Sequence, residues 1–478
     1  MAQQHPRSHR YRRLLKRLYE AIFLLQRLGP PARPHTIIHY DTLNGLATQQ
    51  RFLKTLAFMV DFKKGGDTTA AIAVEETAQD FHFVVAVNDQ SQKETARMVL
   101  ENYLNQLVKI FALPPEQYHE HGDTILLHRV AHFSKIRLKK ELKLLQSTAN
   151  KCINSLHDSQ SSSAQGLINF LRLLGADTGK NPVLSCQRAY SAESDPVLNE
   201  ARHIGRDPED GSNPPAGVVN FKKLVHFVHR VAAHLRSVKR LIDDGARLKP
   251  LLERYRVTAV GSRTPSPRPE VGSLITIDGI LKRILPANDP RHEAMATQLK
   301  QINKQTSLEA WIQDRFAPEE ADKGSIHCEV HLLEHFYQNK LRFARDDPYI
   351  ACSKPSCVCC ELYFRHHSLQ CAQLNTHGRV HPNWAPPLLA EGINDAAWPE
   401  QRHVLGEIAH ALGNRVISRL ERLGNIARNG ALFDSLDGNT VSGVGFVEFA
   451  DETDLTGNER NSSGSEDSDS DHSGGAPL

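Results

Sequence analysis

The sequence lacks any long apolar run, and this absence excludes an integral membrane protein. No stretch approaches the roughly 20 consecutive apolar residues that a membrane-spanning helix requires, and 24% of the residues are charged. No secretory signal is recognised at the N-terminus either. The 478 residues, 40% of them hydrophobic, have room for about two to four domains.

Cysteine is scarce outside one region of the chain. Of the eight cysteines, Cys152 and Cys186 stand alone, and the other six lie between Cys328 and Cys371. Disulfide scaffolds are small and spread their cysteines along the chain, so this distribution indicates a reduced compartment and a metal site. We therefore expect a cytoplasmic or nuclear protein.

The N-terminus has no acidic residue before Glu20 and is rich in arginine. Such a start is typical of mitochondrial transit peptides, which makes mitochondrial import the less favoured alternative. Leucine and isoleucine recur at helical spacing over residues 8–28, until Gly29 and two prolines end the pattern. This periodicity favours an amphipathic helix that docks on the protein.

Charge is distributed unevenly along the chain. Residues 451–478 hold eight acids against Arg460, so the net charge of +3 divides into −7 for this tail and +10 for residues 1–450. The tail has almost no apolar residues, and we expect it to be disordered. A basic body suits an anionic substrate, a nucleotide or a nucleic acid. No dense basic stripe is apparent, so ordinary solvated side chains are the favoured interpretation, and the oligomeric state stays unknown.

Two β-rich runs, 69–77 and 81–88, flank a short polar turn and predict the clearest hairpin of the chain. An amphipathic helix follows over 91–111, and Ser91 with Glu94 has the pattern of a capping box at its start. Further helices are expected near 46–60, 122–156, 218–242, 290–317 and 395–427. Residues 157–217 are read mostly as loop around one helix near 164–174, and the proline-rich 262–269 as a linker or exposed loop.

The chemistry is concentrated between residues 326 and 387. His327 opens a predicted helix over 326–341, and Cys357 and Cys360 form a C-x-x-C pair at the start of another over 357–367. Two thiolates at this spacing can hold one Zn²⁺ from a single helical turn, and an imidazole from a facing helix adds a third ligand. Short strands are expected between and after these helices, at 349–353 and 376–380.

Glu329 is the most informative residue beside these ligands. It lies two positions after His327, where a carboxylate can take a proton from a zinc-activated water and hand it to a leaving amine. The order of His, Glu and C-x-x-C is that of zinc-dependent nucleobase deaminases, written H-x-E…P-C-x-x-C. Here Ser356 separates Pro355 from the first cysteine.

On these residues the sequence resembles the cytidine-deaminase-like superfamily. Within it, the chain is similar to uncharacterised deaminase-like proteins of filamentous fungi, which have relatives in intracellular bacteria. The residues that carry the resemblance are His327-Cys328-Glu329, Tyr349–Ser353, Cys357-Val358-Cys359-Cys360, Thr376–Val380, Trp384 and Pro386-Pro387. The resemblance implies a Zn²⁺ held by His327, Cys357 and Cys360, with Glu329 as proton shuttle in the hydrolytic deamination of a nucleobase, nucleoside or nucleic acid.

The resemblance also implies an α/β fold, a three-layer α/β/α core whose sheet begins with a hairpin. The only good hairpin ends at Asn88, some 240 residues before the His–Glu motif. We therefore expect a large helical insertion in the core, and Asn88 at the strand end where related enzymes place a substrate-binding asparagine. The expected organisation is an N-terminal helical segment (1–68), the first hairpin and helix of the core (69–111), a mostly helical insertion (112–320), the zinc-binding core with a C-terminal helix (321–430) and the acidic tail (451–478).

Three alternatives remain open from the sequence. Cys357, Cys360, His367 and Cys371 could close a structural zinc site, which would make the region a non-catalytic interaction module. Residues 331–335 match the H-x-x-E-H pattern of some metalloproteases, which leaves the C-x-x-C unexplained. Trp384 could stack on a substrate base, although aromatic residues at such places are more often part of a core.

Overall fold

A computed structural model describes residues 8–29, 45–156, 162–176, 180–206, 214–271 and 275–428. The tail expected at 451–478 lies outside these residues. The strands are β1 (Ala70–Glu76), β2 (Phe81–Val87), β3 (Tyr255–Ala259) and β4 (Ala351–Cys352). The helices are α1 (Ser8–Leu28), α2 (Gly45–Val60), α3 (Lys93–Phe111), α4 (Tyr118–His121), α5 (Leu127–Phe133), α6 (Lys135–Leu156), α7 (Ser162–Gly175), α8 (Pro182–Ala192), α9 (Pro196–Ile204), α10 (Ala216–Arg247), α11 (Pro250–Glu253), α12 (Ile277–Ile284), α13 (His292–Thr306), α14 (Leu308–Asp314), α15 (Cys328–Gln338), α16 (Val358–His366) and α17 (Trp398–Arg428).

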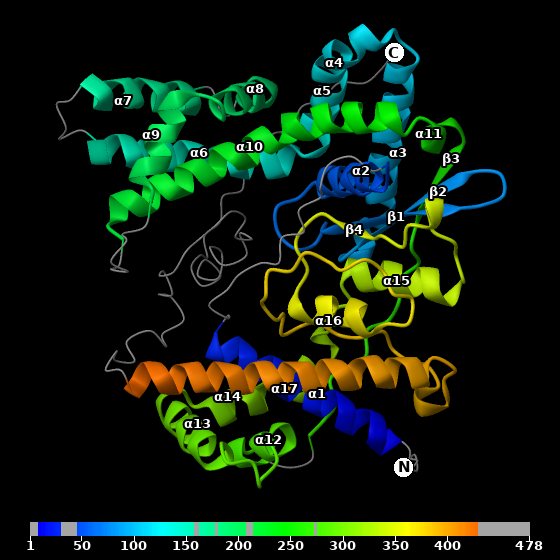
Figure 1. The fold of residues 1–478 in the computed structure, drawn as a ribbon, viewed down its shortest axis with the longest axis vertical. Coiled ribbons are helices and arrows are strands. Elements are labelled where there is room, and N and C mark those ends of the chain that lie inside the picture. The colour runs from blue at the N-terminus through cyan, green and yellow to red at the C-terminus, as the bar shows by residue number, and fades with distance from the viewer. Residues whose placement is uncertain are drawn as a thin grey trace, which may run out of the picture.

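The four strands form one small mixed sheet in the order β3-β2-β1-β4 (Figure 1). The predicted hairpin is its centre: β1 and β2 pair antiparallel, with Ala70 opposite Val87. β4 joins antiparallel to β1, and β3 joins parallel to β2. The fold is thus a helix-rich α/β structure, and its sheet draws together segments from three distant parts of the chain.

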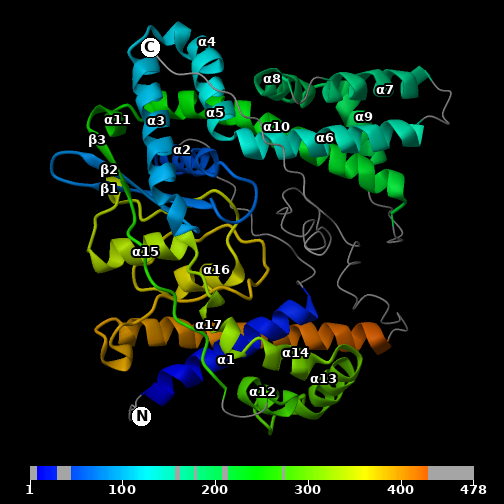
Figure 2. The same cartoon turned by 180° about the vertical axis from the view of Figure 1, so that it is seen from behind.

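Helices cover both faces of this sheet because successive side chains of a strand point to opposite sides. Ile72 and Val85 enter a core formed with α2, α3 and the helices α5 to α10. Ala73 and Val84 enter a second core formed with α1, α12 to α17 and the segment around Trp384. Figure 2 shows the resulting order, with α2 between α10 and the sheet, and α15 and α16 on the opposite side.

Helix α1 docks as its periodicity predicted. Leu18 and Ile22 are fully buried, and the helix lies along α17 (Figure 1). Its one acid, Glu20, is buried and receives hydrogen bonds from the guanidinium of Arg283. Among the described helices, none is long and apolar enough to cross a membrane.

The expectation of loop over most of 157–217 was wrong. α8 and α9 lie in this segment, and each begins with a proline at its first turn behind a capping residue: Asn181 accepts from the Leu184 amide, and Asp195 from the Val197 amide. Proline is favoured at this position because its missing amide hydrogen would have no helical partner there. The prolines therefore begin helices here and do not interrupt them.

Three smaller expectations also differ from the structure. Ser91 does not cap α3, because Asp89 accepts its amide in a short 3₁₀ turn instead. Residues 262–269 are a loop, but it is exposed only in part: Ser266 is buried on Pro387, and Arg268 is buried on Pro382 and Asn383. Residues 376–380 form no strand, only a single bridge between Thr376 and Ser356.

Candidate metal centre

The starts of two helices meet at the predicted site. His327 is the residue before α15 and Cys357 the residue before α16, both in extended backbone conformation. Cys357 Sγ accepts the backbone amide of Cys360 at 3.5 Å, so the thiol caps its own helix. The positive ends of the two helix dipoles therefore face this point, which favours negatively charged thiolates there.

The three side chains have the spacing of one tetrahedral metal site. Cys357 Sγ and Cys360 Sγ lie 3.5 Å apart, and His327 Nδ1 lies 3.6 and 3.4 Å from them. Tetrahedral Zn–S and Zn–N bonds of about 2.3 and 2.0–2.1 Å require about 3.8 Å between sulfurs and about 3.6 Å between nitrogen and sulfur. The residues present thus fit a zinc ion, and in the described part of the chain they form the one His/Cys/Asp/Glu group with metal-binding spacing.

Electrostatics prepares these ligands for a cation. Burial alone would raise the pKa of Cys357, but the Cys359 and Cys360 thiols and the His327 imidazole lower it well below its usual range. Burial alone would lower the pKa of His327, but the neighbouring Cys357 thiolate raises it to about 9. The imidazole and thiolate thus stabilise each other's charged forms, and a metal ion would take the place of the imidazole proton.

Glu329 and Asn88 both form hydrogen bonds with Cys328. Glu329 lies in the first turn of α15, is 4% exposed and accepts the Cys328 thiol at 3.2 Å. The side-chain oxygen of Asn88 accepts the Cys328 amide at 2.8 Å, and its amide group donates to Gly66 O at 2.9 Å. The structure therefore brings the end of the hairpin to the metal-bearing helix, and Asn88 holds the first turn of α15 in place.

Trp384 belongs to the wall of the metal site. Its ring is fully buried, so no face of it is open to a stacked base, and its indole Nε1–H donates to Cys360 Sγ at 3.2 Å. The segment that carries it is bonded to the chain just before both ligand turns: Ala385 donates to Ser325 O, and His377 to Ser356 O. This segment, residues 375–385, thus ties the two ligand turns together.

The alternative ligand sets are not assembled among the described residues. His367, a proposed ligand of a closed structural site, faces Glu334, whose Oε1 lies 3.5 Å from its Nε2. Neither His367 nor Cys371 falls in a group with metal-ligand spacing, and neither do His331 and His335 of the H-x-x-E-H pattern. In the described ranges, the geometry favours a centre with the three ligands His327, Cys357 and Cys360 over the closed site or the protease site.

Two residues that the sequence did not single out lie near the centre. The ring of His381 stands edge-on to that of His327, with the ring centroids 5.3 Å apart. In the sequence, only the spacing of His381 from His377, H-x₃-H, could have pointed to it. Lys54 of α2 interacts electrostatically with Glu329, and burial lowers its pKa. No sequence pattern links Lys54 to the motif, because its position depends on how α2 packs on the sheet.

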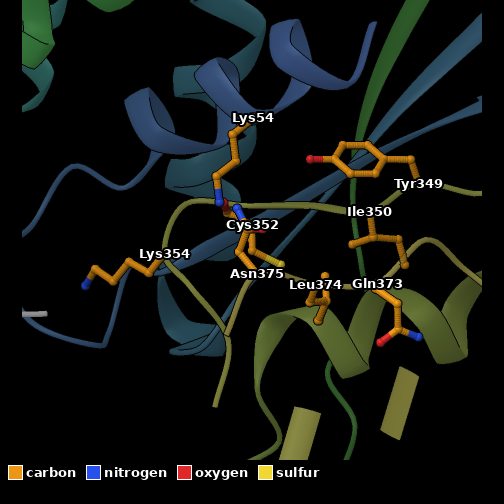
Figure 3. Close-up of a pocket in the computed structure, with 8 residues that line it drawn as sticks. All are labelled: Lys54, Tyr349, Ile350, Cys352, Lys354, Gln373, Leu374 and Asn375. Carbon is orange, nitrogen blue, oxygen red and sulfur yellow. The ribbon is translucent and has the colours of Figure 1, made fainter. Parts of the chain in front are cut away.

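Lys54 lines a small indentation beside the turn that leads to Cys357. Figure 3 shows its side chain reaching from α2 towards Cys352 and Asn375, whereas Lys354 points away from them. The ammonium donates to the carbonyl oxygen of Cys352. The lining residues contribute two lysines, two amides and no carboxylate: Lys54, Tyr349, Ile350, Cys352, Lys354, Gln373, Leu374 and Asn375.

Comparison with known proteins assigns the region of the centre to a class. Residues 326–388 match the model of a family described as OTT_1508-like deaminase. The matched segment contains all three candidate ligands, Glu329 and Trp384. No curated protein and no solved structure matches the chain. The match supports a deaminase-like region, and together with the His/Cys/Cys group it indicates a metal ion.

Proposed function

We propose that the protein is a zinc-dependent hydrolytic deaminase that acts on a nucleobase-type amidine in a free base, a nucleoside or a nucleic acid. The observation that carries the proposal is the three-ligand geometry of His327, Cys357 and Cys360 with the buried carboxylate of Glu329 two residues from the imidazole. In this proposal the sheet and the helices on its two faces are the three-layer deaminase core. Kinship with the fungal proteins and their bacterial relatives is part of the same proposal and rests on the motifs of residues 327–387.

Each residue then has a defined task. His327, Cys357 and Cys360 would hold the zinc, which when bound lowers the pKa of a water from 15.7 to about 7. The carboxylate of Glu329 would accept one proton from the water and deliver it to the ring nitrogen, and would then accept a second proton from the added hydroxyl and deliver it to the departing amine. Asn88 and Trp384 act on this machinery through Cys328 and Cys360, the residues whose atoms they contact.

A non-catalytic zinc-stabilised interaction module is the second candidate, and it is favoured by the short length of the matched segment, residues 326–388. It explains the cysteines and the histidine as well as the enzyme does. It does not explain why a carboxylate is buried in the first turn of α15. The two candidates therefore differ over Glu329.

The substitution Glu329→Gln separates them. The amide fits the same space and is not a ligand, so we expect the variant to fold and to keep its zinc. Loss of general acid–base catalysis costs about 10²–10⁴ in rate. Ammonia release or base conversion is measured for both proteins over cytosine, adenine and guanine compounds, with single-stranded DNA and RNA included. Equal turnover by wild type and variant would remove Glu329 from the mechanism, and turnover by neither would favour the interaction module.

A further inference from the structure

Apart from the arginine-rich helix α1, the positive charge of the protein gathers in one group of helices. Residues 127–242, which contain α5 to α9 and most of α10, hold eighteen lysines and arginines against nine acids, a net charge of +9. The other residues of 1–450 carry only +1. These helices lie on the far side of α2 from the metal-bearing helices α15 and α16 (Figures 1 and 2).

Within this group, α5 and α6 present an unneutralised basic face. Six cations on the two helices are exposed to solvent, and no ion pair among the described residues includes any of them: Arg129, Lys135, Lys139, Lys140, Lys143 and Lys151. The one acid of α6, Glu141, is fully buried and is paired with Arg137, Arg230 and His234. It therefore leaves the charge of the outer face uncompensated.

Two cations of α10 have a different environment. Arg236 and Lys239 are ion-paired with Glu193 and Asp123. Arg236 and Lys239 thus take part in the packing of the bundle, whereas no ion pair among the described residues includes the six cations of the α5–α6 face. This difference is invisible in the sequence, where both helices read as ordinary basic segments.

We propose that the α5–α6 face binds the phosphate backbone of single-stranded nucleic acid and that the substrate of the deaminase site is a base within such a strand. The second clause rests on the function proposed above. A cationic face on helices apart from the metal centre can anchor a polymer, but it cannot touch a nucleoside or nucleotide bound at that centre. A single strand also exposes its bases to the site without the cost of unpairing them.

The dimensions of the face suit this partner. From Lys135 to Lys151 the helix rises about 24 Å at 1.5 Å per residue. A strand that keeps the 3.4 Å spacing of a duplex presents about seven phosphates along this length, and an extended strand presents fewer. An anionic membrane surface is a poorer fit. A helix that lies on a membrane inserts an apolar face, and the apolar face of α6, with Leu138, Leu142 and Leu145, is buried in the bundle.

The test measures binding of a labelled 20-nucleotide single-stranded RNA and DNA to the full chain between 50 and 200 mM salt. Each phosphate contact contributes about 0.7 to the slope of log affinity against log salt. Six contacts give a slope of about −4. The variant Lys135→Gln/Lys139→Gln/Lys140→Gln/Lys143→Gln retains two of the six cations. We expect its salt slope to be about −1.4 and its affinity to be at least tenfold lower than that of the wild type.

A matched control removes the same charge elsewhere. Lys282→Gln/Lys300→Gln/Lys304→Gln/Lys340→Gln changes four exposed lysines outside the bundle, and we expect its affinity to stay within about twofold of wild type. Thermal unfolding of both variants checks that they are folded. Equal losses in the two variants, no loss in the first, or tighter binding of wild type to phosphatidylserine vesicles than to the oligonucleotides would each overturn the proposal. Because binding needs no turnover, Glu329→Gln binds like wild type, and failure of the proposed chemistry stays distinguishable from failure of this face.

Discussion

Replacing Trp384 with phenylalanine tests whether the metal centre depends on a hydrogen bond to one of its ligands. The indole Nε1–H lies 3.2 Å from Cys360 Sγ, and both groups are buried. Phenylalanine keeps most of the apolar ring but has no donor. The sulfur of Cys360 would then face an apolar wall, which disfavours the thiolate that a metal requires.

The magnitude follows from the nature of this hydrogen bond. Hydrogen bonds to a charged partner contribute about 1.5–3 kcal/mol, and each 1.4 kcal/mol is a factor of ten in a dissociation constant. We therefore expect zinc affinity to fall about tenfold to hundredfold, the range found when groups that orient metal ligands are removed. Trp384→Phe also leaves a small cavity, so the metal-free protein should lose some stability as well.

Competition with a chromophoric chelator measures the zinc affinity, and the thiolate-to-metal charge-transfer band of the Co²⁺-loaded protein reports on Cys360 itself. Tyr363→Phe is the control, because Tyr363 is also fully buried and its hydroxyl donates at 2.6 Å to Glu334, which is not a ligand, while its ring beside Trp384 is kept. We expect the control to lower thermal stability and to leave zinc affinity unchanged. Equal zinc affinities for Trp384→Phe and wild type, with an unshifted Co²⁺ band, would refute the reasoning.

Three further predictions follow from the same structure. The double variant Cys357→Ala/Cys360→Ala should purify without zinc, whereas the wild type should hold about one equivalent by elemental analysis; undiminished zinc in the variant would contradict the ligand assignment. Asn88→Ala removes the acceptor for the Cys328 amide, so we expect about 1 kcal/mol lower stability and a lower rate in whichever assay detects activity, with zinc retained. Glu141→Gln leaves the buried cations around it uncompensated and should lower the free energy of unfolding by about 3–5 kcal/mol at pH 7. Burial would raise the pKa of Glu141, but Arg137 and Arg230 lower it well below 4.5, so its contribution is complete above pH 4.5 and is lost as the pH falls below that value; urea unfolding of both proteins between pH 3 and 7 should show the difference shrinking towards acid.

The sequence was sufficient where local patterns decide the structure. The two β-rich runs of 69–88 and the polar turn between them specified the hairpin, and the histidine and C-x-x-C motifs marked two helix starts that do meet. The sequence was insufficient where the same local pattern is compatible with two different structures. Most of 157–217 was read as loop, but Pro182 and Pro196 begin helices there. β3 was missed because five residues become a strand only by pairing with β2.

The role of Trp384 illustrates a second limit of sequence reading. An aromatic residue after the motif suggested a platform for a base, but whether the ring lies in a pocket or in the core depends on the course of residues 375–385. Those residues bond to the chain before both ligand turns, and this path turns the indole inward, onto Cys360. Contacts of this kind are long-range, and no periodicity in the chain encodes them.

The burial of Glu329 is the strongest physical argument for an enzyme over an interaction module. The side chain is 4% exposed, and no ion pair among residues of the described ranges includes it. Its side-chain hydrogen bond comes from the thiol of Cys328, a weak donor, and Lys54 acts on it only through space. A buried carboxylate without a cation in contact is costly, by several kcal/mol after relaxation. If the region were a non-catalytic zinc module, an apolar residue at position 329 would make the folded protein more stable than a glutamate does. Local rules are broken in this way chiefly at functional sites, where the group is kept for its chemistry, and the chemistry within reach of Glu329 is that of the three ligands beside it.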